Sequence, residues 1–233
     1  MDQLKLSLQF VKLNFRDLIS FSIPWFIFSI YFVFFIMNEL SAVIENINEP
    51  ENLFSFIENN SFNFRVIGFF EDIVFIFFIA SMCLQFNNIY EGKNSESFVK
   101  IFKVIFVKIP YLFVATFLSG IAISLGFLVL ILPGVYLFGR LCLSPIYITI
   151  ENKGPIESIR ESWVATDEFG GRLFVYTLLF GILLILITIL TSFLLSLSSL
   201  TSVLVIPVIL LEIIILSMVL CHIYFSLYKH LKQ

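Results

Sequence analysis

Charged residues are scarce in this sequence. Lys, Arg, Asp and Glu make up 13% of its 233 residues, whereas hydrophobic residues make up 59%. A soluble domain is about 25% charged and about 45–50% apolar, and its surface cannot accommodate such an excess of apolar side chains. The net charge of −3 and the lack of a basic cluster exclude a nucleic-acid binder. The composition therefore excludes a soluble enzyme and a disordered chain, and it predicts a polytopic membrane protein.

Cysteine and histidine are also scarce. The cysteines are Cys83, Cys142 and Cys221; all lie in apolar stretches without a CxxC pair, and we interpret them as small buried hydrophobic residues. The histidines are His222 and His230, and one adjacent Cys–His pair does not make a metal site. The sequence motifs of zinc proteases, serine hydrolases and P-loop proteins are missing. We therefore expect no metal, no cofactor and no enzymatic activity.

Long apolar runs dominate the chain instead. A helix rises about 1.5 Å per residue and the hydrocarbon core is about 30 Å thick, so a crossing needs about 20 apolar residues. The charge-free stretches 109–139 and 173–211 are too long for one crossing, and a turn at Leu132-Pro133-Gly134 and a Ser/Thr-rich segment at 196–202 divide them. Continuous apolar runs also differ from the alternation of a membrane barrel.

The predicted fold is therefore an all-α bundle of six transmembrane helices forming one integral membrane domain over residues 1–233. The predicted spans cover residues 19–38, 66–86, 109–131, 135–150, 173–195 and 203–228. The fourth span is short and contains Pro145, which leaves open whether it crosses the bilayer completely.

Lys and Arg residues fall almost entirely on one side of this arrangement. Twelve lie before span 1, between spans 2 and 3, between spans 4 and 5, or after span 6, whereas the other side has only Arg65. Because Lys and Arg are enriched in cytoplasmic loops, both termini are expected in the cytoplasm. The acidic segment 39–64 would then be a solvated loop on the outer side.

Amphipathic patterns precede the spans on the cytoplasmic side. They predict three interfacial helices, around residues 2–16, 93–108 and 155–163. A unit of one surface helix and two spans thus occurs three times, which suggests an internal repeat. The surface helices either dock on anionic lipid headgroups through Lys and Arg or seal the cytoplasmic end of the bundle.

Four ionisable residues fall inside the predicted spans: Glu71, Asp72, Arg140 and Glu212. A charge at the bilayer centre costs at least about 2.5–3.5 kcal/mol, which makes each one a candidate. Spans 2, 4 and 6 all start at the outer face, so the four residues are predicted to form one buried polar layer in the outer leaflet. We expect Arg140 to pair with Glu212 or with Glu71 and Asp72. The layer is then either an ion pair that locks helix packing or a polar site for an ion or a lipid headgroup, unless Glu71 and Asp72 simply lie at the interface.

The segment from residue 131 carries a family resemblance. It reads ILPGVYLFGRLCLSPIYITIENKGPIESIRESWVATDEFGGRLF and combines a Pro-Gly turn, a short span, an E-x-x-G turn, an amphipathic helix with Trp163, and Arg172-Leu-Phe before the next span. This segment and the N-terminal LQFVKLNFRDLI resemble the YciC-like family of bacterial inner-membrane proteins. The membrane domain attached to some glycerophosphodiester phosphodiesterases is similar more loosely. The outer loop and the first two spans depart from the family pattern.

The resemblance implies a multispanning protein of the bacterial inner membrane and brings no catalytic residues with it. The first functional hypothesis is a non-enzymatic protein that organises the membrane or is a partner of other membrane or envelope proteins. The second is a transporter or lipid-handling protein that uses the layer of Arg140 and Glu212. A substrate path predicts a cavity lined by these two residues, whereas a scaffold predicts that they are dry and paired.

Overall fold

The computed structural model describes residues 2–45, 50–93, 96–197 and 202–232. Helices and short turns account for these residues, and none of them forms a strand. The helices are α1 (Asp2–Leu13), α2 (Phe15–Glu45), α3 (Pro50–Tyr90), α4 (Phe98–Val129), α5 (Ile131–Leu141), α6 (Ser144–Glu151), α7 (Pro155–Ala165), α8 (Gly170–Leu197) and α9 (Ser202–Leu231). The predicted all-α class is confirmed.

Six helical stretches of the described residues are long and apolar enough to cross a membrane. They are Phe15–Asn38, Phe62–Tyr90, Phe98–Val129, Ile131–Glu151, Gly170–Phe193 and Ile206–Leu231. This agrees with the predicted polytopic bundle.

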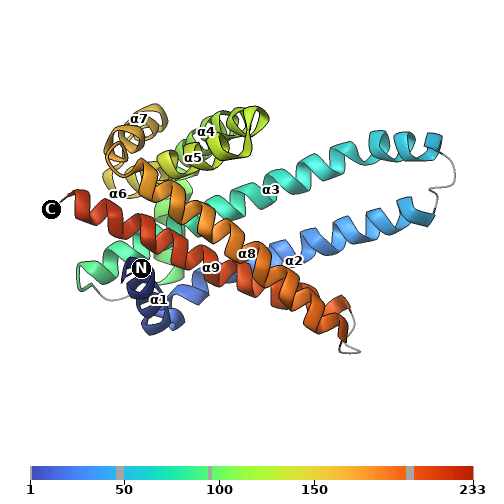
Figure 1. Cartoon of the computed structure of the whole chain (residues 1–233), viewed down its shortest axis with the longest axis horizontal. Helices are drawn as coiled ribbons and strands as arrows, with labels where there is room; N and C mark the ends of the chain where they lie inside the picture. Colours follow the sequence, from blue (N-terminus) through green and yellow to red (C-terminus); the bar gives the residue numbers. More distant parts are fainter. Residues whose placement is uncertain (1, 46–49, 94–95, 198–201, 233) are drawn as a thin grey trace.

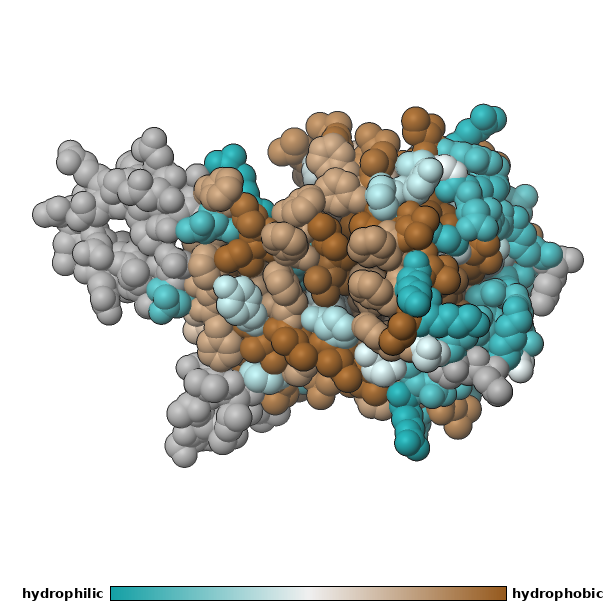
Figure 2. Space-filling view, turned by 180° about the vertical axis from the view of Figure 1, so that it is seen from behind, coloured by the Kyte–Doolittle hydropathy of each residue, from teal (hydrophilic) through white to brown (hydrophobic). Residues whose placement is uncertain are grey.

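Both ends of the chain lie at the same end of the molecule, which we call the terminal end (Figure 1). Helices α1, α6 and α7 also lie there, whereas α2 and α8 finish, and α3 and α9 begin, toward the opposite, far end. Figure 2 shows apolar side chains over the middle of one face and hydrophilic side chains gathered at the terminal end. The molecule therefore has one strongly polar end next to an apolar band.

The core is formed mainly by α3 and α9, against which α1, α2, α4 and α6 pack. Phe78, Met82 and Phe86 of α3 are fully buried, as are Met218 and Phe225 of α9. The rings of Phe86 and Phe225 lie 5.7 Å apart. Because lipid tails are as apolar as these side chains, close packing rather than water exclusion holds this core together.

Two of the three predicted surface helices are separate helices. Asn14 ends α1, where its side-chain amide donates to the Phe10 carbonyl at 2.9 Å. Pro155 occupies the first turn of α7, where its missing N–H has no cost. The second is not separate, because α4 runs from Phe98 to Val129 through Pro110. A proline bends or strains a membrane helix without having to end it.

The predicted acidic loop at 39–64 is wrong over most of its length. Helix α2 continues to Glu45 and α3 begins at Pro50, while residues 46–49 lie outside the described residues. The sequence has neither Gly nor Pro between residues 39 and 49, so nothing ends α2 where its apolar run ends. Hydropathy predicts where a helix leaves the hydrocarbon core, but α2 and α3 continue as helices beyond that point.

The predicted fourth span is two helices rather than one. Helix α5 ends at Leu141 and α6 begins at Ser144, with Pro145 in its first turn. The turn between α4 and α5 is also displaced, because the helix breaks at Leu130 and Pro133 lies inside the first turn of α5.

The connection after the fifth span agrees with its prediction. Helix α8 ends at Leu197 and α9 begins at Ser202, and residues 198–201 between them lie outside the described residues. The Ser/Thr-rich segment therefore contains the connection.

Candidate functional site: a buried arginine under a surface helix

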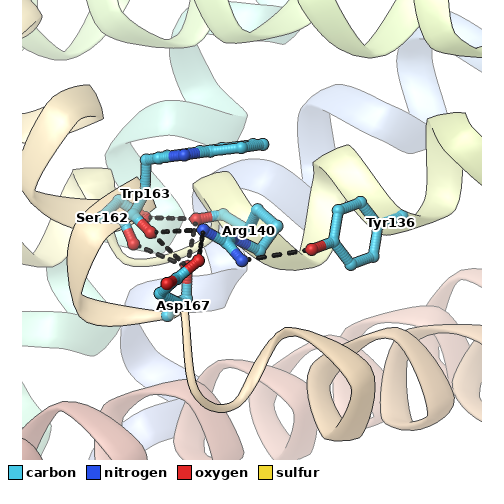
Figure 3. A network of polar contacts seen from close by, with 6 residues as sticks. Tyr136, Arg140, Ser162, Trp163 and Asp167 are labelled. Carbon is cyan, nitrogen blue, oxygen red and sulfur yellow. Dashed lines mark hydrogen bonds and ion pairs between the residues drawn. The ribbon is translucent and has the colours of Figure 1, made fainter.

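Among the charged side chains that the structure describes, Arg140 is the most completely enclosed. Its side chain is 3% exposed, whereas that of its partner Asp167 is 78% exposed. The Nη2 atom donates to the Trp163 carbonyl oxygen at 2.7 Å and to Asp167 Oδ1 at 2.9 Å. The Nη1 atom donates to the Tyr136 hydroxyl at 3.1 Å. Figure 3 shows the guanidinium enclosed between α5 and the segment that contains α7.

Aromatic rings also contact the guanidinium. Its central carbon lies 4.2 Å from the centre of the Trp163 ring and 5.7 Å from that of Tyr136. A cation over a ring face is stabilised by about 0.5–2 kcal/mol, with the larger values at desolvated sites. The buried Nε atom is the part of the guanidinium that has no hydrogen-bond partner.

The backbone of Arg140 is held by α7 as well. Its carbonyl oxygen accepts hydrogen bonds from the hydroxyls of Ser162 at 2.8 Å and Thr166 at 3.1 Å. The same Ser162 oxygen accepts a hydrogen bond from the Leu143 N–H at 3.1 Å. Because α5 ends at Leu141, its last carbonyls lack partners within the helix. Helix α7 therefore satisfies the end of α5 and fixes the bend toward α6.

Gly170 gives this arrangement the space that it needs. A Cβ atom at this position would lie 3.0 Å from Arg140 Nη1, 3.1 Å from Arg140 Cδ and 3.1 Å from the Tyr136 hydroxyl. At the neighbouring Gly171 a Cβ atom would meet nothing within 4 Å. The Gly-Gly pair at the start of α8 thus contains one residue that is required by packing and one that is not.

The chemistry available to this cluster is recognition and stabilisation. A guanidinium remains protonated and has no acceptor, so it neither takes nor gives a proton. Among the described residues, no group of three His, Cys, Asp or Glu side chains could hold a metal ion. What Arg140 does through its contacts is to join α5, α7 and the start of α8.

The predicted pairing of Arg140 with Glu212, Glu71 or Asp72 is wrong, since its carboxylate partner is Asp167. Glu71 instead accepts a hydrogen bond from the Trp25 indole at 2.9 Å, and it joins α3 to α2. Asp72, the next residue, is exposed on α3.

Glu212 lies far from Arg140 along the bundle. Its Oε1 atom accepts a hydrogen bond from the Thr191 hydroxyl at 2.7 Å, and its Oε2 atom is buried without a partner. Arg140 is next to Gly170 at the start of α8, and Thr191 follows 21 residues later. At about 1.5 Å per residue this is about 32 Å, roughly the thickness of the hydrocarbon core. The two residues therefore do not share a layer.

Sequence reasoning missed Asp167 because this residue lies outside every predicted span. It also missed a second buried polar group on α9. His222 Nδ1 lies 2.9 Å from the Ser7 hydroxyl, and Nε2 lies 3.2 Å from the Tyr90 hydroxyl. The imidazole stacks on Phe10 with the ring centres 4.0 Å apart, and it joins α1 and α3 to α9. The three cysteines are free thiols.

A network of ion pairs closes the terminal end. Lys232 lies 2.8 Å from Glu151, and Lys153 lies 3.4 Å from Glu151 and 3.3 Å from Glu161. Burial disfavours the charged form of Lys153, but hydrogen bonds to Glu161 and Glu151 outweigh it and raise the pKa of the ammonium. These contacts tie the end of α9 to α6 and α7.

The fold and these contacts define the class of this protein. It is an all-α membrane protein with several helices that are long and apolar enough to span a bilayer. Its buried charge is bound by residues of the same chain.

Comparison with known proteins gives relatives of the same class. The chain is 26% identical over 118 residues to a UPF0259 membrane protein of Buchnera aphidicola subsp. Acyrthosiphon pisum strain 5A. It is 29% identical over 119 residues to a UPF0259 membrane protein of strain Tuc7. Each match covers 48% of this chain and 48% of the relative, so the chain spans about half the length of the curated relatives it matches. No family model and no solved structure matches the chain. The names of these relatives support a bacterial membrane protein family and state no activity.

Proposed function

We propose that this protein is a multi-pass protein of the bacterial inner membrane that acts without catalysing a reaction, by organising the membrane or by binding other envelope proteins. The observation that supports this proposal best is the state of Arg140. Its guanidinium is bound by Trp163, Asp167 and Tyr136 of the same chain. A scaffold is expected to satisfy its buried charges in this way.

The geometry weighs against a transport path through Arg140 and Glu212. The α8 residues that contact them, Gly170 and Thr191, lie about 32 Å apart along that helix. The described residues form a cavity of about 320 Å³ at the terminal end and another of about 410 Å³ beside Phe62 and Arg65. Neither is lined by Arg140 or Glu212.

Native mass spectrometry of the purified protein tests this proposal. Wild type and Arg140→Ala are compared in mild detergent, with Arg160→Ala on the exposed face of α7 as the control. The proposal predicts that Arg140→Ala melts at a lower temperature while its set of bound small molecules equals that of the wild type. A solute that is present in the wild type and in Arg160→Ala, and lost only in Arg140→Ala, contradicts it and favours the lipid-handling or transport alternative.

The proposed orientation places the terminal end in the cytoplasm. This end carries Lys5, Lys12, Lys153, Arg172 and Lys229, together with most of the other cations. A green fluorescent protein fused to the C-terminus is expected to fluoresce, and alkaline phosphatase at the same position is expected to be inactive. An active phosphatase fusion would reverse the orientation.

A further inference from the structure

A basic cavity opens at the terminal end between α1, the first turn of α8 and the last turns of α9. Its volume is about 320 Å³. Arg172, His230, Gln3 and Ser226 give it polar atoms, and Phe169 and Tyr176 add aromatic rings. None of these residues belongs to the Arg140 cluster.

The lining of this cavity carries the positive charge of Arg172. Arg172 is exposed, its guanidinium carbon lies 5.9 Å from the centre of the Phe169 ring, and it forms no ion pair with the described residues. No carboxylate lines the cavity. Because α8 begins at Gly170, the positive end of its dipole also points to this region. An anion is therefore the ligand that this electrostatic environment favours, and a guanidinium binds phosphate well.

The floor of the cavity is apolar. It is made by Leu173, Ile223 and Leu227, which are buried. These residues belong to the spans Gly170–Phe193 and Ile206–Leu231, Leu173 near the start of the first and Ile223 and Leu227 near the end of the second. A phosphate at the mouth with a hydrocarbon chain below it matches this order of polar rim and apolar floor.

We propose that this cavity binds the headgroup of one anionic phospholipid. The lack of a carboxylate leaves an ammonium headgroup without a partner, so phosphatidylglycerol is expected to bind better than phosphatidylethanolamine. This proposal rests on the proposed membrane-organising function and makes it more specific. The proposed orientation matters only for deciding which leaflet supplies the lipid.

Lipid titration followed by native mass spectrometry tests this site. Delipidated wild type, Arg172→Gln and Arg160→Gln are titrated with phosphatidylglycerol and, separately, with phosphatidylethanolamine. We expect one phosphatidylglycerol per wild-type chain and an affinity about tenfold lower in Arg172→Gln, as for the loss of one charge-assisted hydrogen bond. The Arg160→Gln control, which removes the same charge outside the cavity, is expected to bind like the wild type.

Three results overturn the proposal. The first is equal binding of the two lipids to the wild type, and the second is unchanged phosphatidylglycerol binding in Arg172→Gln. The third is saturation of the site by inorganic phosphate without any phosphatidylglycerol binding, which would make it a site for a free anion. Because lipid binding is measured on the purified protein, a negative result would not affect the orientation, which the fusion reporters test separately.

A different observation concerns the tip of the α4–α5 hairpin. Five consecutive residues form this tip, Leu128, Val129, Leu130, Ile131 and Leu132, and all are exposed, by 56% to 81%. The hairpin is tight, because a Cβ atom on Gly126 would lie 2.9 Å from the Gly134 Cα atom. An apolar tip of this kind would be unfavourable in water.

The Arg140 cluster fixes how deep this tip reaches. Asp167 is 78% exposed, so its carboxylate must lie in water or among headgroups, and Arg140 is 2.9 Å away from it. From Arg140 to Leu130, α5 rises about 15 Å, which is half of the hydrocarbon thickness. Helix α8 starts at the same level and has 28 residues, about 42 Å. Accordingly, the hairpin tip lies well short of the far end in Figure 1.

We infer that α4 and α5 form a re-entrant hairpin whose tip lies among lipid acyl chains near the bilayer midplane. The helices that cross are then α2, α3, α8 and α9. Because the hairpin enters and leaves through the same face, the orientation of α7, α8 and α9 does not change.

Spin labelling measures the depth directly. A nitroxide is placed at Leu130→Cys in nanodiscs, on a background with Cys83, Cys142 and Cys221 replaced by Ala. Glu157→Cys on the exposed face of α7 is the control. We expect the label at 130 to be relaxed by oxygen and shielded from a water-soluble nickel chelate, and the label at 157 to show the opposite. Relaxation by the nickel chelate at both positions would mean that the hairpin crosses the bilayer.

Discussion

Two ionisable side chains within the helix bundle, the buried Arg140 and the half-buried Glu212, are held in very different ways. Arg140 has three hydrogen-bond partners and two aromatic rings around it, and α7 covers it. Glu212 has one partner, the Thr191 hydroxyl, and its Oε2 atom has none. Arg140 lies where a surface helix can fold over it, whereas Glu212 lies inside a hairpin of apolar helices. A charge near the end of a bundle can thus be satisfied by connecting segments that are out of reach further inside.

The largest effect is expected from Arg140→Ala. It removes three hydrogen bonds and leaves a cavity beneath α7, which should lower the free energy of unfolding by about 3 kcal/mol. Thermal or SDS-induced unfolding in detergent measures this loss. The matched control is Arg160→Ala on the exposed face of α7, with an expected change below about 0.5 kcal/mol. If Arg140→Ala were as stable as Arg160→Ala, the contacts around Arg140 would contribute no stability, and Arg140 would not be held more firmly than Glu212.

Ser162→Ala tests whether the hydrogen bonds from this side chain of α7 to the backbone at the end of α5 matter as much as the ion pair. The Ser162 hydroxyl satisfies both the Arg140 carbonyl and the Leu143 N–H in a buried position. Leaving these two groups without it should cost about 2 kcal/mol. Ser20→Ala is the control, because this exposed hydroxyl bonds only locally, to the Asp17 carbonyl. Equal unfolding curves for both variants would show that the Ser162 hydroxyl does not hold α7 in place.

Gly170→Ala and Gly171→Ala compare two adjacent glycines at the start of α8. The first should destabilise by about 1 kcal/mol, because the new methyl group meets Arg140 and the Tyr136 hydroxyl. The second should be neutral or stabilising, since alanine is the better helix former and the space is open. Melting temperatures of the pair decide this, and the reverse order would contradict the described packing.

Glu212→Gln is expected to change stability by less than about 0.5 kcal/mol, because the amide oxygen still accepts the Thr191 hydrogen bond. Because Arg140 and Glu212 do not touch, the effects of Arg140→Ala and Glu212→Ala should add within about 0.5 kcal/mol. The double-mutant cycle is measured by the same unfolding assay. Strong coupling between the two sites would restore the predicted polar layer.

The smallest effect is expected at high pH. Hydrogen bonds to Glu161 and Glu151 raise the pKa of Lys153 above its ordinary value of 10.5, so the folded state holds this proton more tightly than the unfolded chain. The stabilisation is complete below pH 10.5 and is lost as the pH rises through the raised pKa. Glu161→Gln should therefore melt slightly below wild type at neutral pH and equally once the pH exceeds the raised pKa of Lys153, with a difference below about 0.5 kcal/mol. Glu157→Gln on the exposed face of the same helix should show no such trend.

Much of this fold could be predicted from the sequence, because bilayer thickness dictates helix length. The runs 173–195 and 203–228 fall inside α8 and α9, and Pro155 marks the start of α7. The acidic loop was wrong because hydropathy does not report where a helix ends. The fourth span coincides with the apolar stretch Ile131–Glu151, but its break at Cys142 and Leu143 was not predicted, because a continuous apolar run conceals it.

The candidate site was predictable only in part. Arg140 was singled out because a charge in an apolar run is costly, and in the structure this residue is buried. Its partner was not found, since a depth counted from the outer face placed Arg140 beside Glu212. In the structure Arg140 lies at the terminal end, where Asp167, a residue between α7 and α8, can reach it. Sequence distance along one span does not reveal which connecting segment folds back onto it.

Hydrogen exchange of α7 tests most directly whether this helix is fastened to the bundle by Arg140. Amides of residues 155–165 are followed in nanodiscs for wild type and Arg140→Ala, with those of α9 as the internal reference. We predict that α7 is protected in the wild type and exchanges at least about tenfold faster in Arg140→Ala, while α9 is unchanged. Equal protection of α7 in both proteins would show that Arg140 does not hold it.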